Sequence, residues 1–129
     1  MNQDIKTRWL EALRSGRYKQ GKGSLRTTDD QYCCLGVLCD LAVQDGIVEW
    51  EPHRDEGADV YEIDGLLGSL SYEVRVWAGI SDDAGRCEPV YLDIGERTIF
   101  VGDSLIQLND QTEIPFNFEQ IADVIEEQF

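Results

Sequence analysis

The sequence has few basic side chains, a single histidine and no long hydrophobic segment. Its 129 residues contain 11 lysines and arginines against 26 aspartates and glutamates, a formal net charge of −15. A body of this charge lacks the basic surface that contacts with nucleic-acid phosphates require. No apolar run approaches the roughly 18 residues of a transmembrane helix, and the N-terminus does not resemble a signal peptide. We therefore expect a cytoplasmic protein with reduced cysteines and no direct contact with a membrane or a nucleic acid.

The length and composition indicate one globular domain that spans residues 1–129. A chain of this size, with 42% hydrophobic residues, can bury roughly two-thirds of its unfolded surface without a disulfide or a metal ion. The sequence has no internal repeat, no low-complexity segment and no linker. We expect a single domain without a cofactor.

The charge is distributed unevenly along the chain. Residues 1–30 hold seven basic and four acidic side chains, whereas the other 99 residues hold four basic and 22 acidic ones. This asymmetry leaves three interpretations open. The acidic body can bind a basic partner protein, the basic segment can hold a small anion, or the charge can serve solubility alone.

The hydrophobic pattern predicts an α+β fold with a small antiparallel sheet, an N-terminal helix, a buried cysteine-rich helix and a C-terminal amphipathic helix. Apolar residues recur at helical spacing near both ends of the chain, whereas the middle helix is apolar on all sides. Alternating residues predict strands and one clear hairpin. The expected helices are 4–15, 32–43, 70–79, 104–110 and 118–128, and the expected strands lie at 47–52, 60–64 and 90–103.

Three of the four cysteines occur in the stretch QYCCLGVLCD, residues 31–40. Structural zinc sites need four ligands, usually in two closely spaced pairs, and the spacing of Cys33, Cys34 and Cys39 does not fit. A cysteine nucleophile needs an imidazole base, and the chain offers only His53, in an acidic loop. We therefore interpret the stretch as a buried helix in which cysteine acts as a small hydrophobic residue. No metal site is expected.

The glycine-rich segment 16–26 carries the densest basic charge. Its backbone N–H groups and four cations can cradle a phosphate, although the segment lacks the GK[ST] ending of a Walker loop. The alternative is a solvated loop that pairs with the acidic body. In the anion-binding interpretation the ligand contacts are Arg17, Lys19, Lys22 and Arg26, and Tyr18 stacks on a base.

Five separated blocks resemble a family of small phage and prophage accessory proteins. The blocks are WLEALRSGRYKQGKGSLR (9–26), CCLGVLCDLA (33–42), VWAG (76–79), LND (108–110) and FEQIADVIE (118–126). The chain departs from that family's pattern at QTEIPFN (111–117), where a more turn-like segment is usual. The resemblance carries over no catalytic residue. Because phage accessory proteins of this size often inhibit host defence, it implies an inhibitor.

The leading hypothesis is a non-enzymatic phage protein that inhibits a bacterial defence system, of the anti-CRISPR or anti-restriction type. An acidic face can imitate the phosphates of DNA and occupy the basic groove of a nucleic-acid-binding host protein. The alternatives are a sequestering protein for a small anion such as a nucleotide second messenger, and a cysteine-dependent hydrolase. A homo-oligomer is also consistent with the sequence. The expected acidic surface comprises Glu49, Glu51, Asp55, Glu56, Asp59, Glu119, Asp123, Glu126 and Glu127.

Overall fold

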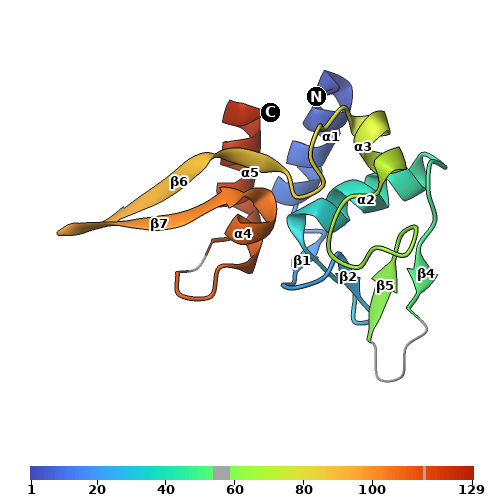
Figure 1. Ribbon diagram of the computed structural model, residues 1–129, viewed down its shortest axis with the longest axis horizontal. Coiled ribbons are helices and arrows are strands. Elements are labelled where there is room, and N and C mark those ends of the chain that lie inside the picture. The colour runs from blue at the N-terminus through green and yellow to red at the C-terminus, as the bar shows by residue number, and fades with distance from the viewer. Residues whose placement is uncertain (54–58, 115) are drawn as a thin grey trace.

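The computed structural model describes residues 1–53, 59–114 and 116–129 (Figure 1). These residues form an α+β fold with two separate sheets, which confirms the predicted fold class. The helices are α1 (Gln3–Arg14), α2 (Cys34–Gln44), α3 (Tyr72–Ala78), α4 (Leu105–Asp110) and α5 (Phe118–Gln128). The strands are β1 (Lys19–Gln20), β2 (Arg26–Thr27), β3 (Gln31–Tyr32), β4 (Glu51–Pro52), β5 (Val60–Glu62), β6 (Arg86–Ile94) and β7 (Arg97–Ser104).

The first sheet consists of five very short strands in the order β1-β3-β2-β5-β4. β1 and β3 pair in parallel, whereas the other neighbours pair in antiparallel, so one pairing differs from the expected sheet. The strand predicted at 47–52 is reduced to β4. The reason is local: Gly46 has a φ of 75°, and the N–H of Ile47 donates to the Ala42 carbonyl, so this residue completes the end of α2.

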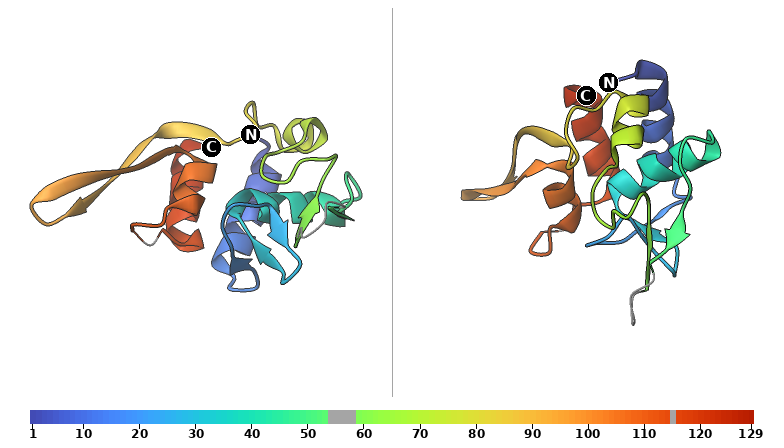
Figure 2. Two further views of the ribbon diagram at one scale, coloured as in Figure 1. Left: turned by 60° about the horizontal axis from the view of Figure 1, so that its bottom comes forward. Right: turned by 45° about the vertical axis from the view of Figure 1, so that its right-hand side comes forward.

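The first and last helices lie side by side and bury their predicted apolar faces (Figure 2). Asn2 caps α1, and Asn117 and Gln120 form a capping box at the start of α5. The Trp9 and Phe129 rings meet edge to face, with centroids 6.5 Å apart, which joins the two helices at one end. Among the described residues, no helix combines the length and the apolar character needed to cross a membrane.

Helix α2 occupies the centre of the hydrophobic core. Eight of its residues are buried, because the helix is covered by α1 and α3, by α4 and by the five-stranded sheet. The indole of Trp9 donates a 3.0 Å hydrogen bond to the Cys34 carbonyl, so α1 and α2 are fixed by a directional contact as well as by packing.

The first turn of α2 approaches the chain that leads into β2 so closely that it has room only for glycine. A Cβ atom at Gly36 would lie 1.8 Å from the Leu25 carbonyl oxygen. The same carbonyl accepts a 3.2 Å hydrogen bond from the N–H of Cys33, just before the helix begins. The contact therefore sets the distance between α2 and the glycine-rich segment.

The side chain of Asn109, on α4, connects three parts of the chain. Its Oδ1 accepts from the N–H of Cys34 at 3.1 Å and from Nε2 of Gln20 at 3.0 Å, and its Nδ2 donates to the Gly21 carbonyl at 2.8 Å. The residue is fully buried, so its bonds to Cys34 and Gly21 satisfy groups that water cannot reach. Asn109 thus fixes the glycine-rich segment against the N-terminus of α2.

Replacing Gly36 with alanine tests the close approach. Alanine is the better helix former by about 1 kcal/mol, so without the contact the change would stabilise α2. With the contact, we expect a loss of about 3 kcal/mol in the free energy of unfolding, because the backbone of Leu25 must move. Urea unfolding followed by tryptophan fluorescence measures it. The control is Gly68→Ala, whose Cβ would meet one carbonyl oxygen at 3.9 Å; equal effects in the two variants would contradict the prediction.

Candidate functional site

The cysteines of α2 belong to the core. Cys33 is the N-cap residue of α2, its Sγ accepts from the N–H of Gly36 at 3.3 Å, and it is buried together with Cys34 and Cys39. Burial raises the pKa of Cys33 to about 12 and raises the pKa of each of the other two thiols well above 9.0. A nucleophilic cysteine needs the opposite shift, so the arrangement supports the core interpretation over the hydrolase hypothesis.

His53, the candidate base, contacts a carboxylate of the five-stranded sheet. Nδ1 of His53 lies 2.8 Å from Oε2 of Glu62, next to β4 and β5 of the sheet. Across residues 1–53, 59–114 and 116–129, no three histidine, cysteine, aspartate or glutamate side chains converge as a metal site requires.

Alkaline unfolding tests the state of the buried thiols. Because their pKa is raised in the folded chain, the folded state keeps protons that the unfolded state releases above about pH 9. The free energy of unfolding should therefore fall as the pH rises from 8 to 10, with each thiol contributing up to roughly 1.4 kcal/mol per pH unit. Urea titrations at pH 8, 9 and 10 measure the slope. Cys39→Ala should flatten it, and an unchanged slope would contradict the assignment.

The basic residues of segment 16–26 do not all face a common ligand space. Arg17 and Lys19 are exposed, and the Arg17 side chain contacts Ser15. Lys22 donates to the Gln111 carbonyl, which ties the segment to the end of α4. Arg26 is directed into the protein. The structure therefore leaves Arg17 and Lys19 at the open surface, engages the exposed Lys22 with one backbone carbonyl, and directs only Arg26 inward.

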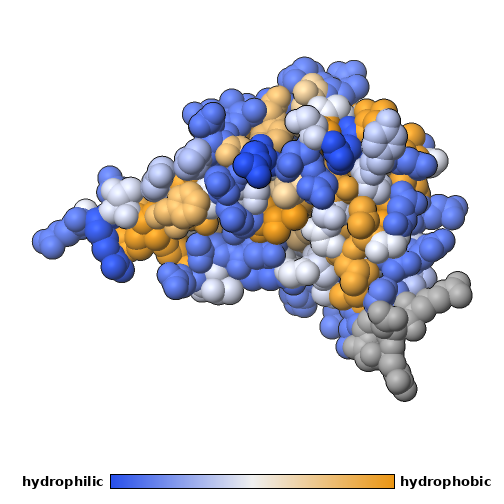
Figure 3. All heavy atoms as spheres, in the orientation of Figure 1, coloured by the Kyte–Doolittle hydropathy of each residue, from blue (hydrophilic) through white to orange (hydrophobic). Residues whose placement is uncertain are grey.

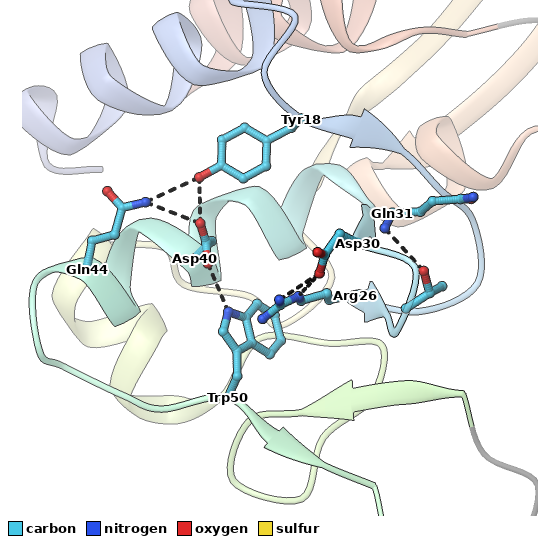
Figure 4. Close-up of polar contacts among 8 residues, drawn as sticks. Tyr18, Arg26, Asp30, Gln31, Asp40, Gln44 and Trp50 are labelled. Carbon is cyan, nitrogen blue, oxygen red and sulfur yellow. Dashed lines mark hydrogen bonds and ion pairs between the residues drawn. The ribbon is translucent and has the colours of Figure 1, made fainter.

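Arg26 lies within a half-buried cluster of aromatic rings, and Figure 4 shows it beside Trp50 and bonded to Asp30. Its guanidinium carbon is 4.2 Å from the ring centroid of Tyr61 and 5.4 Å from those of Tyr32 and Trp50. NH2 of Arg26 also donates to Asp30 at 2.6 Å. These contacts connect β2, β3 and β5, whose pairing alone involves only two or three residues per strand. The cation therefore stabilises the sheet.

Tyr18 belongs to the same cluster and is not free to stack on a base in this arrangement. Its hydroxyl donates a 2.6 Å hydrogen bond to Asp40 of α2, whose carboxylate also accepts from the indole of Trp50 at 3.0 Å. Its ring meets Tyr32 edge to face, with centroids 5.0 Å apart. Burial, followed by the bond to Asp40, raises the pKa of the Tyr18 hydroxyl. Sequence reasoning missed Asp40 and Trp50 because no local pattern shows which face of α2 meets the sheet.

The role of Arg26 can be tested by Arg26→Lys. Lysine keeps the charge but loses the planar group that covers three rings while bonding Asp30, so we expect a loss of about 1–2 kcal/mol in the free energy of unfolding. Urea unfolding measures it. Arg17→Lys, at an exposed position, is the control and should change stability by less than about 0.5 kcal/mol. If Arg26→Lys lowers the free energy of unfolding no more than the control does, a structural role for Arg26 is refuted.

The predicted acidic residues fall into two separate groups. Of the residues expected near 49–64, Glu49, Glu51 and Asp59 are exposed beside the five-stranded sheet, whereas Asp55 and Glu56 lie outside the described residues. In Figure 1, α2 lies between β4 and α5, so the acidic residues beside the sheet and those on α5 do not form one surface. All four members of the α5 group, Glu119, Asp123, Glu126 and Glu127, are exposed, and NH2 of Arg14 pairs with Asp123 at 2.8 Å and with Glu126 at 3.1 Å.

The β6–β7 hairpin projects from the body of the molecule, on the same side as α4 and α5 (Figures 1 and 2). Hydrophobic side chains lie along it with hydrophilic ones around them (Figure 3). Tyr91 and Phe100 are paired across the strands with ring centroids 5.6 Å apart, and they are 58% and 49% exposed. The sequence predicted this hairpin over 90–103 but not its projection. The sequence signal that could have revealed the ring pair is a two-residue turn at Gly95 and Glu96, because that turn places Tyr91 opposite Phe100.

We define the acidic lobe as residues 86–129, which comprise the hairpin, α4 and α5. It holds ten acidic and two basic side chains. Two shallow cavities border it. One, of about 180 Å³, is lined by Gln20, Lys22, Phe116 and Asn117. The other, of about 400 Å³, lies between β7 and α4, and its lining consists of Phe100, Val101, Gln107, Asp110, Gln111 and Thr112.

Comparison with known protein families finds a match over residues 1–129 to a family described as a domain of unknown function. Comparisons with curated proteins and with solved structures give no significant match.

Proposed function

The chain belongs to the family DUF8296, a domain of unknown function, and on that premise we propose from its surface that it is a non-enzymatic binding protein for a basic partner. The partner is a nucleic-acid-binding protein, and the bound chain inhibits it by occupying its basic groove. The resemblance to phage accessory proteins extends this proposal to a host defence protein in the bacterial cytoplasm.

The observation that carries the proposal is the concentration of exposed carboxylates on the acidic lobe. The outer side of α5 presents four carboxylates within nine residues, and α1 neutralises part of that charge through Arg14. Charge of one sign on one side of a small protein speeds association with an oppositely charged partner and repels nucleic acid from the same groove. An acidic helix face can therefore compete with DNA or RNA for a basic surface.

The arrangement of the basic segment gives less support to the anion-binding alternative. Gln20 donates to Asn109 and to the Phe116 carbonyl, and Lys22 donates to the Gln111 carbonyl, so the polar groups at the smaller cavity already have partners. Arg17 and Lys19 remain available at the surface. Anion binding by segment 16–26 stays a prediction, with these two cations and the exposed Lys22 in its favour.

Competition with nucleic acid tests the proposed function. The tagged protein is used to capture partners from bacterial lysate, and the purified partner is then bound to fluorescent DNA or RNA. We expect the chain to displace the nucleic acid at 50 mM NaCl and to lose affinity for the partner at least about tenfold at 300 mM, because charge pairing is screened. A partner without nucleic-acid affinity, or a salt-independent complex, would contradict the proposal.

Charge reversal locates the surface that competes. Glu119→Lys with Glu127→Lys changes α5 at two exposed positions outside the Arg14 pairs and should weaken displacement about tenfold. The matched control, Glu49→Lys with Glu51→Lys, makes the same change in net charge on the other side of the molecule. Equal losses in the two variants would show a dependence on net charge alone and would refute a role for α5.

A further inference from the structure

The β6–β7 hairpin keeps apolar side chains at the surface although it is long enough to bury them. Tyr91 and Phe100 lie opposite each other on one face of the hairpin, and Ile94, on the other face near the tip, is 43% exposed. By contrast, Val90 and Leu92 of the same strand pack against the core. A two-stranded hairpin in water is only marginally stable by itself, so a face of this kind gains stability when another molecule covers it.

Both edges of the hairpin are blocked near its base by side-chain amides. On β7, Nε2 of Gln111 donates to the Val101 carbonyl at 3.3 Å, and Oε1 of Gln107 accepts from the N–H of Asp103 at 2.8 Å. On β6, Oε1 of Gln128 accepts from the N–H of Glu88 at 2.7 Å. The next residue of β6 is Pro89, which has no N–H to offer. A partner strand therefore cannot extend this sheet along the base of either edge.

The hairpin register explains how α4 comes close enough to supply two of these amides. Tyr91 pairs with Phe100 and Val90 pairs with Gly102, so Val101 is an extra residue that forms a bulge in β7. Val101 is buried, and a Cβ atom at Gly102 would lie 2.8 Å from Cβ of Gln107. The bulge and the glycine let α4 pack directly under β7, which creates the groove between them.

The groove beside Phe100 combines an exposed ring with an acidic group. Asp110 lines it, and Oδ1 of this carboxylate accepts from the N–H of Gly23 at 3.0 Å and from Nδ2 of Asn109 at 3.2 Å. Both bonds use the same oxygen, so Oδ2 of Asp110 can accept from a ligand. The nearby cation is Lys22, which donates to the Gln111 carbonyl at the margin of the groove.

Charge selects the occupant of this surface. Asp110 of α4 lines the groove beside Phe100, the hairpin carries further carboxylates, and the acidic lobe has five acidic side chains for each basic one. A second copy of the chain would bring two such lobes together, and the edges blocked near the base of the hairpin limit the strand pairing that could offset the repulsion. A segment with arginine or lysine between apolar residues matches both features: its cations can stack on Phe100 and pair with Asp110, and its apolar side chains can cover Tyr91.

We propose that the face formed by Tyr91 and Phe100, together with the groove between β7 and α4, is the docking site for a basic, partly apolar segment of the partner protein. This inference rests on the proposed function, because it names the element through which the basic partner is held. The docking is face-on, through side chains, and the acidic face of α5 acts beside it.

A synthetic peptide with arginine and leucine residues separated by glycine is the probe for this site. Fluorescence anisotropy measures its affinity at 100 mM NaCl, and ¹H–¹⁵N NMR spectra of the labelled protein locate it. We expect shifts confined to the hairpin and residues 107–112. Tyr91→Ser with Phe100→Ser should weaken binding at least about tenfold. Tyr72→Ser with Val76→Ser, which removes even more exposed apolar side chains from α3, is the control and should leave the affinity unchanged.

Three outcomes would overturn the docking site. If a peptide with glycine in place of leucine binds equally well and shifts mainly α5, the attraction is only general charge pairing. If ultracentrifugation finds a dimer that the Tyr91 and Phe100 changes dissociate, the occupant is a second copy. If the spectra of the wild-type chain shift elsewhere, the site is misplaced, and this result does not depend on how well any variant folds.

The same variants separate this inference from the proposed function. If the hairpin variant still displaces nucleic acid from the partner while the α5 variant does not, the docking site fails and the proposed function survives. If the peptide binds the hairpin but the captured partner keeps its nucleic acid, the docking site stands and the inhibitory function fails.

Discussion

The fold depends on one buried amide. Asn109 holds the first N–H of α2, the Gly21 carbonyl and the side chain of Gln20, so helix, glycine-rich segment and C-terminal part of the chain share a single polar centre. The residues that it joins are 75 to 89 positions away in sequence. A buried polar group of this kind rewards one arrangement, because any displacement leaves several donors and acceptors without partners. The close contact at Gly36 operates on the same interface and sets its spacing.

The sequence was a good guide to the helices and a poor one to the sheet. Local spacing was enough to predict α1 and α5, because a stripe of apolar residues at helical period is typical of an amphipathic helix that packs on a core. The five short strands have two or three residues each and are positioned by contacts such as those of Arg26, which no local pattern contains. A sequence shows which residue types are available for such a cluster, but tertiary packing decides which of them come into contact.

The candidate site shows the same division. Composition indicated an acidic protein with a basic segment, and the structure adds that part of each charged group is used internally: Arg26 among aromatic rings, Lys22 on a carbonyl, and Arg14 on the acids of α5. The sequence predicted the hairpin but not the exposure of its apolar face, and the reason is physical. Alternation predicts which side chains share a face, whereas only the surrounding elements decide whether that face is covered.

The glutamine side chains that block the hairpin edges affect the behaviour of the protein at high concentration. Exposed apolar strands with free edges are templates on which identical chains stack, and such stacking ends in fibres or precipitate. In this chain the edges near the base of the hairpin are occupied by Gln107, Gln111 and Gln128, and like charges keep copies apart. The molecule can therefore expose an apolar face and still resist aggregation when a cell produces it in quantity.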